Sequence, residues 1–365
     1  MTQHSPDSSA SSASSTSSDS SAGAAEGARP SRIGTVALSA GGPEVGVQGL
    51  GCMGMSFAYG PTDADAARAT LTRALELGVT FFDTADVYGA GENEQFLAPF
   101  FQAHRDEVTI ATKFALSIDP NQPDRRTIRN DAPYIRESVD ASLRRLGVEH
   151  IDVYYMHRRD TSVPIEETVG TMAELVSAGK VGHLGLSEVT AAELRAAHAV
   201  HPITVVQSEW SLFSRDVEAS VVPAAAALGV GFVPYSPLGR GFLTGSFVQA
   251  ESELTDDDFR RSQPRFTGDN AAANAALLEP VRTIAAAHGA SPAQIALAWV
   301  QQQTEVHRLP VVPIPGTRKP TRVEENTAAT RIHLTEAELA LLEPIAGKVA
   351  GDRYADMSFT SAGRD

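Results

Sequence analysis

The sequence predicts a single (β/α)₈ TIM barrel from three observations. Eight short apolar segments recur along the chain, and each is followed by a stretch rich in Ala, Leu, Glu and Arg. The segments are nearly continuous apolar runs, which is typical of parallel strands covered on both faces. No conspicuous linker interrupts the repeat, and 365 residues suit one such barrel, which commonly takes about 250 residues or more.

The first thirty residues differ in composition from the rest of the chain. Residues 1–30 are mostly Ser, Ala and Gly with scattered acids, and such a segment buries too little apolar surface to offset its ordering entropy. We therefore expect a disordered Ser-rich tail at 1–30 and a barrel domain at 31–365. The domain opens with RIGTVAL and EVGVQ around Gly41 and Gly42, a pattern that predicts a β-hairpin.

The repeat itself assigns the strands and helices. The predicted strands are GLGCMGM (49–55), TFFDTA (80–85), VTIATKF (108–114), IDVYYMH (151–157), VGHLGLS (181–187), ITVVQSE (203–209), VGFVPYS (230–236) and VVPIPGT (311–317). The predicted helices cover 63–77, 93–103, 133–146, 165–178, 191–199, 217–228, 274–288 and 322–330. An added helix at 291–303 and a loop at 239–270 fall outside the repeat, and a loop that long is usually functional.

Composition argues against several classes of function. The formal net charge of −15 disfavours a nucleic-acid groove, since an acidic surface repels phosphate backbones. The single cysteine, Cys52, allows no internal disulfide, and the N-terminus lacks a positively charged start followed by an apolar run. Both features fit a cytoplasmic protein. No apolar run of about 18 residues occurs, so we predict no membrane span.

Two further motifs are misleading. GLGCMG at 49–54 matches the dinucleotide fingerprint G-x-G-x-x-G, but no helix opens at its third glycine and the later acid, Glu76, falls inside a helix. These glycines instead let the chain approach a ligand or form a tight strand end. His198 and His201 have no Cys or carboxylate at ligand spacing, so we predict no metal site.

Four polar residues mark the predicted strand ends, where barrel enzymes carry their chemistry. Asp83 lies near the end of the second strand, Tyr88 in the loop after it, Lys113 in the third strand, and His157 at the end of the fourth. Singly, each has an ordinary explanation in capping or rim packing. Together they are complementary, because a buried lysine needs an acid and Asp83 on the adjacent strand can supply it.

This group of residues suits the reduction of an aldehyde or ketone. Hydride that arrives at a carbonyl carbon leaves an alkoxide, which must take a proton from a neutral acid. Tyr88, with an ordinary pKa of about 10, can be that acid, and Lys113 would lower its pKa. Asp83 would hold Lys113 in place, and His157 would donate a hydrogen bond to the carbonyl oxygen.

Longer motifs then identify a family. DTADVYG, ATKF, DVYYMH, GLSE, VVQSEWS, VPYSPLGRGFLTG and PIPGTRKPTRVEEN follow one another on successive strands and resemble the aldo-keto reductase superfamily from residue 32 onward. GLGCMGMS and GDRY further resemble the branch that includes pyridoxal reductase and perakine reductase. The resemblance implies NADPH-dependent reduction of a small-molecule carbonyl compound, with Tyr88 as general acid and Asp83, Lys113 and His157 completing a catalytic tetrad.

The resemblance also implies contacts with NADPH or NADP⁺. Ser187 and Gln207 resemble residues that hydrogen-bond the nicotinamide carboxamide, and Tyr235 resembles the aromatic residue on which the ring stacks. Glu188 stands where many members have Asn, a departure that bears on the carboxamide contact. The other expected contacts are Gly54, Met55, Ser236, Leu238, Gly241, Gly316, Thr317, Arg318, Arg322, Glu325 and Asn326.

The last βα unit indicates which dinucleotide is bound. Arg318 and Arg322 lie at a helix N-terminus, where backbone N–H groups and two guanidinium groups can hold a phosphate, which favours NADPH over NADH. Many family members have Lys-Ser at Gly316-Thr317, so Arg318 is expected to replace that lysine. Glu325 and Asn326 match positions that contact adenine.

Two other segments are assigned to the site. The loop from Gly239 to Gly241 is either a flexible excursion or a cover for the pyrophosphate, with Arg240 supplying charge. Met55, Tyr59, Trp210 and Phe213 lie beside the site and are candidates for the substrate pocket, although aromatic residues at strand ends also serve packing.

Two alternative functions remain open. One is an NADPH-sensing regulatory subunit like the potassium-channel β subunits, which share the fold. The other is a barrel isomerase of sugar phosphates, which would act without nicotinamide. The identity of the carbonyl compound and the oligomeric state do not follow from the sequence.

Overall fold

The computed structural model describes residues 31–56, 58–60, 62–119, 122–245, 254 and 258–364. Residues 1–30, where we expect a disordered tail, lie outside this part of the chain. From Arg32 onward the chain forms one compact unit.

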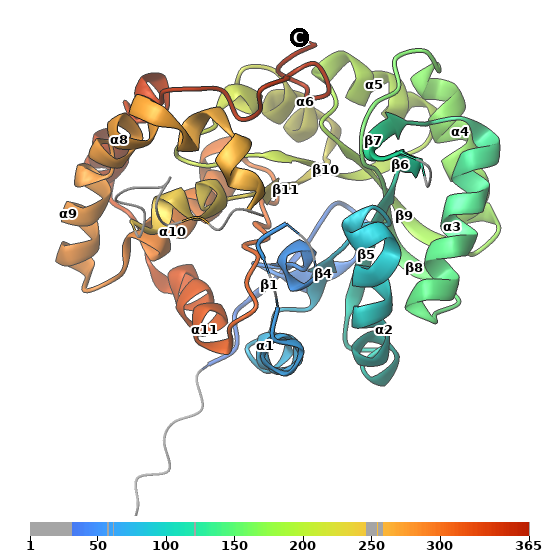
Figure 1. Ribbon diagram of the computed structural model, residues 1–365, viewed down its shortest axis with the longest axis horizontal. Coiled ribbons are helices and arrows are strands. Elements are labelled where there is room, and N and C mark those ends of the chain that lie inside the picture. The colour runs from blue at the N-terminus through green and yellow to red at the C-terminus, as the bar shows by residue number, and fades with distance from the viewer. Residues whose placement is uncertain are drawn as a thin grey trace, which may run out of the picture. The chain divides into compact units, whose positions relative to one another are not determined.

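Seven parallel strands form one curved sheet at the centre of this unit. In spatial order they are β3 (Leu50–Gly51), β4 (Phe81–Asp83), β5 (Thr109–Phe114), β8 (Ile151–Met156), β9 (Val181–Ser187), β10 (Ile203–Glu209) and β11 (Gly231–Tyr235). An extended segment at 310–314 lies between β11 and β3: the N–H of Phe232 donates to Pro310 at 2.8 Å, and that of Gly49 to Pro313 at 2.9 Å. The eighth predicted segment thus completes the barrel, and the predicted fold class is confirmed (Figure 1).

This eighth segment is irregular because of its prolines. Pro310, Pro313 and Pro315 have no N–H to donate, so a continuous ladder with both neighbouring strands cannot form. Close packing replaces the missing ladder of hydrogen bonds. A Cβ on Gly51 would lie 2.9 Å from the carbonyl oxygen of Ile314, so this glycine of the GLGCMG motif serves a tight contact at the strand end.

Helices surround the sheet. They are α1 (Ala64–Glu76), α2 (Glu92–Ala103), α3 (Ala132–Leu146), α4 (Ile165–Ser177), α5 (Ala191–Val200), α6 (Val221–Leu228), α8 (Gly268–Ala276), α9 (Glu279–His288), α10 (Pro292–His307), α11 (Pro320–Ala328) and α12 (Glu336–Leu342). Side chains cap several starts, with Thr190 and Ser291 forming capping boxes. The predicted helix at 274–288 is wrong in one respect. It is two helices, because Pro280 fits the first turn of α9 but cannot continue α8.

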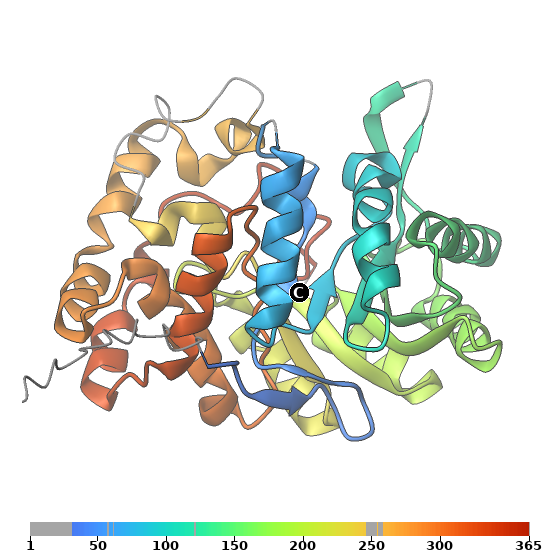
Figure 2. The same cartoon turned by 90° about the horizontal axis from the view of Figure 1, so that it is seen from below.

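Two antiparallel hairpins lie at opposite ends of the barrel (Figure 2). The predicted N-terminal hairpin pairs β1 (Thr35–Ala37) with β2 (Glu44–Gly46). The second pairs β6 (Leu116–Asp119) with β7 (Gln122–Ile128) directly after β5. No strand or helix is predicted there from the sequence.

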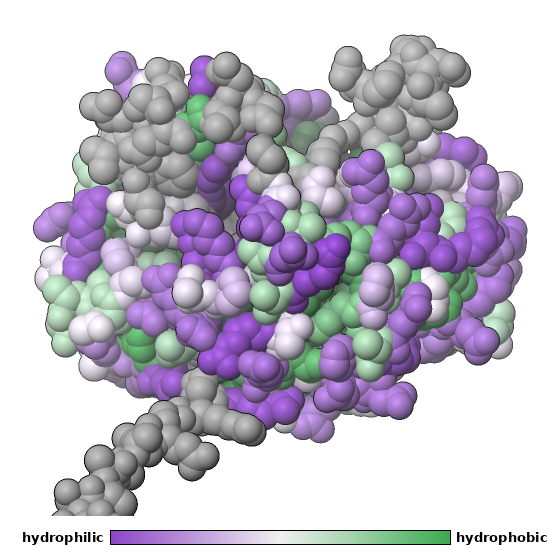
Figure 3. Space-filling model, turned by 60° about the horizontal axis from the view of Figure 1, so that its bottom comes forward, coloured by the Kyte–Doolittle hydropathy of each residue, from purple (hydrophilic) through white to green (hydrophobic). Residues whose placement is uncertain are grey.

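The apolar core has two layers. The barrel interior is filled by Leu38, Val45, Phe81, Ala111, Val153, Tyr155, Val205, Val233, Val312 and Ile314. A larger cluster lies between sheet and helices. On the face shown in Figure 3, hydrophilic residues are interspersed with hydrophobic ones. Within the described residues, no helix has both the length and the apolar character needed to cross a membrane. The filled interior leaves the carboxyl ends of the strands as the rim on which a site can be built.

Candidate active site

The four residues of the predicted tetrad lie together at the carboxyl ends of three neighbouring strands. Asp83 is the last residue of β4, Lys113 the last but one of β5, and His157 follows β8. Tyr88 begins a short 3₁₀ turn, η2 (Tyr88–Gly91), which continues through Gly89 at φ 60°. This sharp turn directly after β4 returns Tyr88 toward the strand ends.

Asp83 and Lys113 form a buried ion pair, with exposed fractions of 3% and 0% for their side chains. Lys113 Nζ donates to Asp83 Oδ1 and, at 2.8 Å, to the carbonyl oxygen of Thr84. Gln207 Nε2 donates to Asp83 Oδ2 at 2.8 Å. Burial raises the pKa of Asp83 and lowers that of Lys113, and their mutual attraction opposes both shifts. The pair is therefore held in a fixed geometry.

Tyr88 lies against both Lys113 and His157. Lys113 Nζ is 5.4 Å from the centroid of the Tyr88 ring, and the rings of Tyr88 and His157 meet edge to face with centroids 6.0 Å apart. Burial and the charge of Asp83 raise the pKa of Tyr88, and the charge of Arg158 lowers it, with a net upward shift. The lowering of this pKa that we expected from Lys113 stays a prediction.

Arg158 is a site residue that sequence analysis missed. It follows His157, is 7% exposed, and donates from Nη1 to the carbonyl oxygen of His157 at 2.7 Å and to Ser187 Oγ at 3.4 Å. The position of Arg158 in the sequence was the available signal. A cation directly after a strand-end histidine lies at the same rim of the barrel as that histidine.

Glu188 joins the strand ends to the C-terminal segment. It is fully buried and accepts hydrogen bonds from Arg353 Nη1 at 3.1 Å, Tyr235 Oη at 2.7 Å and the N–H of Ser361 at 3.0 Å. Burial raises the pKa of Glu188, but the charges of Arg353 and Arg158 bring it to about 2. Glu188 is thus ionised and fully engaged within the protein.

The residues expected around the nicotinamide lie on adjacent strands. Ser187 ends β9 and Gln207 lies in β10, and both are buried. Tyr235 ends β11, held through its hydroxyl by Glu188. Ser236 and Leu238 lead into η4 (Gly239–Thr244), which contains Gly241, while Gly54 and Met55 belong to η1 (Met53–Met55) after β3.

The two arginines of the last βα unit differ in their contacts and exposure. Arg318 holds a loop: Nη1 donates to Thr62 Oγ1 at 2.9 Å and Nη2 to the carbonyl oxygen of Tyr59 at 2.8 Å. Arg322 is exposed in the first turn of α11. Glu325 accepts a hydrogen bond from Ser291 Oγ at 2.5 Å. Arg322 is therefore the more available of the two cations, with Gly316, Thr317 and the buried Asn326 nearby in the chain.

The proposed pocket residues occupy contrasting environments. Tyr59 is partly exposed, with its ring edge to face with Phe259. Met55 and Phe213 are each 2% exposed. Trp210 is fully buried, packs on Phe232 with centroids 4.9 Å apart, and donates from Nε1 to Glu218 at 2.8 Å. Trp210 therefore belongs to the core, and its assignment to a pocket wall is corrected to a packing role.

Arg240 of the predicted covering loop is tightly held. Its guanidinium lies 4.8 Å from the ring centroid of Phe259 and 4.6 Å from that of Tyr354, and Nη2 is 3.7 Å from Glu209. Residues 246–253 and 255–257 of this loop lie outside the described residues.

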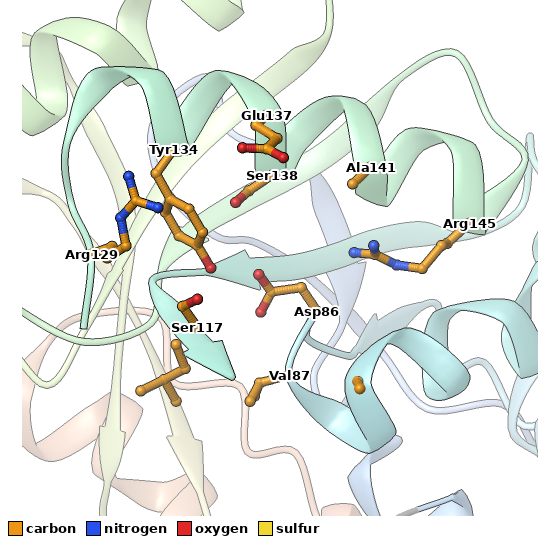
Figure 4. Close-up of a pocket in the computed structure, with 11 residues that line it drawn as sticks. Asp86, Val87, Ser117, Arg129, Tyr134, Glu137, Ser138, Ala141 and Arg145 are labelled. Atoms are coloured by element: carbon orange, nitrogen blue, oxygen red, sulfur yellow. The ribbon is translucent and has the colours of Figure 1, made fainter. Parts of the chain in front are cut away.

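A separate pocket of about 340 Å³ has none of the tetrad residues in its lining (Figure 4). Its lining includes Asp86 from the loop after β4, Ser117 from β6, and Tyr134 and Ser138 from α3. Asp86 Oδ1 is buried and, among the described residues, has no hydrogen-bond partner. Burial, together with the charge of Glu94, raises the pKa of Asp86 well above its ordinary value.

Comparison with known proteins places this geometry in context. Residues 49–346 match the model of the Aldo/keto reductase family. The chain is 45% identical to a probable aldo-keto reductase 1 of Glycine max over 328 residues, which are 89% of this chain and 92% of the relative. Its structure is similar to that of a glycerol dehydrogenase from Gluconobacter oxydans, with a TM-score of 0.76, 27% identity, and coverage of 88% of this chain and 98% of the other. A thermostable aldo-keto reductase solved with the inhibitor epalrestat gives a TM-score of 0.66 at 26% identity, covering 86% and 100% of the two chains.

Proposed function

Because the chain belongs to the aldo/keto reductase family, we propose that it reduces an aldehyde or ketone to an alcohol with NADPH, with Tyr88 as the general acid. Membership makes the chain an oxidoreductase of carbonyl compounds. The observation that carries the proposal is the placement of Tyr88 between His157 and the buried Asp83–Lys113 pair. A neutral phenol beside a hydrogen-bonding imidazole is suited to protonate a carbonyl oxygen as charge develops on it.

Each tetrad residue then has a distinct task. Tyr88 donates its hydroxyl proton to the carbonyl oxygen, and His157 donates a hydrogen bond to the same oxygen. Lys113 stabilises the tyrosinate that remains, since its ammonium lies 5.4 Å from the ring centroid. Asp83 keeps the ammonium in place, and Gln207 keeps Asp83 in place. The bound cofactor supplies the hydride.

The residues present fit a phosphorylated nicotinamide dinucleotide. The hydroxyl of Tyr235 is anchored by Glu188, which presents a fixed ring for the nicotinamide to stack on. The N-cap of α11, Lys319, makes no side-chain hydrogen bond with the helix, so the first turn and the exposed Arg322 are available to an anion. We assign the 2′-phosphate to this helix end, with Arg318 positioning the adjacent loop at Tyr59 and Thr62.

The assay for this function is the loss of NADPH absorbance when the protein is given aromatic aldehydes, ketones and quinones. We expect steady turnover with NADPH and a much higher KM for NADH. Arg322→Met should raise the KM for NADPH and leave that for NADH unchanged, with Lys348→Met, in a 3₁₀ turn outside the site, as a control. Tight NADPH binding without sustained turnover on any carbonyl would contradict the proposal and favour a regulatory subunit.

A further inference from the structure

Arg158 is a buried cation without a carboxylate partner in the part of the chain that the structure describes. Its two hydrogen-bond acceptors, the carbonyl oxygen of His157 and Ser187 Oγ, are both uncharged. The guanidinium also lies 5.5 Å from the ring centroid of Phe359. These contacts fix the direction of the side chain but leave its charge without a counter-ion.

Other buried cations of the chain are paired differently. Arg353 lies 3.1 Å from Glu188, and Lys113 is paired with Asp83. Glu188 influences Arg158 electrostatically, but its oxygens are already bound by Arg353, Tyr235 and Ser361. Because a buried charge is costly unless it is paired, the exception at Arg158 calls for a ligand that supplies the missing anion.

The position of Arg158 indicates which ligand that is. Its backbone follows His157, which we propose to bind the carbonyl oxygen, and its Nη1 reaches Ser187 at the end of the next strand. The charge of Arg158 also acts on Tyr88 and Lys113. The guanidinium therefore lies at the reacting end of the site, away from α11, where we place the phosphate of NADPH.

We propose that Arg158 determines specificity by binding a carboxylate or comparable anionic group carried by the carbonyl substrate. The inference rests on the proposed reductase function and names the class of its substrate. A planar guanidinium fork matches the two oxygens of a carboxylate. In a protein with a net charge of −15, a buried unpaired cation beside the tetrad would also oppose the general repulsion of an acidic substrate.

The test compares substrates that differ in charge but share one reacting aldehyde. We would measure kcat and KM for 3- and 4-carboxybenzaldehyde and for their methyl esters, at saturating NADPH, in the parent protein, Arg158→Met and Arg158→Lys. Arg159→Met is the matched control, because Arg159 is the next residue and lies 3.4 Å from Glu193.

We expect the parent protein to prefer at least one acid over its ester. Arg158→Met should lower kcat/KM for that acid by roughly 10- to 100-fold, the effect of losing a charge-assisted hydrogen bond, mainly through KM. The esters should change little, Arg158→Lys should retain part of the preference, and Arg159→Met should resemble the parent protein.

Two results would overturn the inference. The first is a parent protein that does not distinguish acids from esters. The second is an equal loss for acids and esters in Arg158→Met, accompanied by weaker NADPH binding, which would make Arg158 a contact of the cofactor or of Tyr88. If Arg158→Met does not fold, Arg158→Lys and Arg158→Gln provide the same comparison. Turnover of the esters tests the reductase function separately.

Discussion

The ammonium group of Lys113 and the carboxylate of Asp83 form an ion pair whose side chains are at most 3% exposed. Because neither charge is solvated, each depends on the other. Removing one partner leaves an uncompensated buried charge, which typically costs roughly 3–5 kcal/mol. The pair is thus a structural element of the barrel as well as part of the proposed tetrad.

Asp83→Asn should therefore destabilise the protein by roughly 3 kcal/mol, measured by urea unfolding at neutral pH. Asp83→Asn combined with Lys113→Met removes both charges and should recover more than half of that loss. NADPH oxidation should be absent from the single and the double variant alike. A double variant no more stable than Asp83→Asn would show that the pair is not the source of the loss.

Arg353→Met should expose the dependence of Glu188 on its partner. At pH 7 we expect a loss of roughly 3–5 kcal/mol in the free energy of unfolding, since Glu188 is left ionised and buried. The pKa of Glu188 is lowered to about 2 in the folded protein, below its ordinary value of about 4.3. The stability it contributes is therefore present above that value and is lost as pH falls toward 2.

The loss in the free energy of unfolding caused by Arg353→Met should therefore be smaller at pH 3.5 than at pH 7. It is measured by urea unfolding at both pH values. The control is Arg136→Met, because Arg136 and Glu174 form an ion pair with side chains at least 50% exposed, worth about 0–1 kcal/mol. If the loss caused by Arg353→Met does not vary with pH, Arg353 does not stabilise the protein through the charge of Glu188.

Asp86→Asn should stabilise the protein. Burial raises the pKa of Asp86, so the folded state binds this proton more tightly than the unfolded state does, and stability falls as pH rises through the raised pKa. Asn removes that penalty. We expect a gain of roughly 1 kcal/mol or more at pH 8 and a smaller gain at pH 5, by thermal unfolding.

Glu137→Gln is the control for this pocket, because Glu137 is an exposed carboxylate in the same lining. Its effect should stay within about 0.5 kcal/mol at both pH values. A gain in Asp86→Asn that is larger at pH 5 than at pH 8 would contradict the assigned direction of the pKa shift.

Substitutions at two glycines distinguish a requirement for close packing from the low helix propensity of glycine. A Cβ on Gly185 in β9 would overlap the ring of Tyr155 inside the barrel, whereas a Cβ on Gly170 in α4 meets nothing within 4 Å. Gly185→Ala should destabilise the protein by roughly 1–3 kcal/mol, and Gly170→Ala should stabilise it by roughly 0.5–1 kcal/mol. Effects of the same sign in urea unfolding would contradict this account of the interior.

The sequence predicted the barrel, and it predicted that the residues of the proposed tetrad lie together, because both rest on local patterns. The strands are short apolar runs, and Asp83, Lys113 and His157 lie at the ends of three of them, where parallel register brings them together. Ordered motifs added Tyr88 and the residues expected to bind the cofactor.

What the sequence did not predict depends on contacts between distant segments. Glu188 and Arg353 are 165 positions apart, so their pairing has no local pattern. A residue at the end of a strand, such as Trp210, can face either a site or a helix. Tertiary packing determines which, and here it buries Trp210 in the core. The alternation in β6, LSID, is only four residues long, and its partner β7, QPDRRTI, is mostly polar, so the hairpin has a weak sequence signal.

The central claim is that Tyr88 supplies the proton, and Tyr88→Phe tests it most directly. The measurement pairs single-turnover reduction of an aldehyde by NADPH with a titration of NADPH binding. We predict a rate lower by about 10²- to 10⁴-fold with unchanged NADPH affinity, because the ring remains and only the hydroxyl is lost. A rate equal to that of the unsubstituted enzyme would contradict the assignment of Tyr88 as the acid.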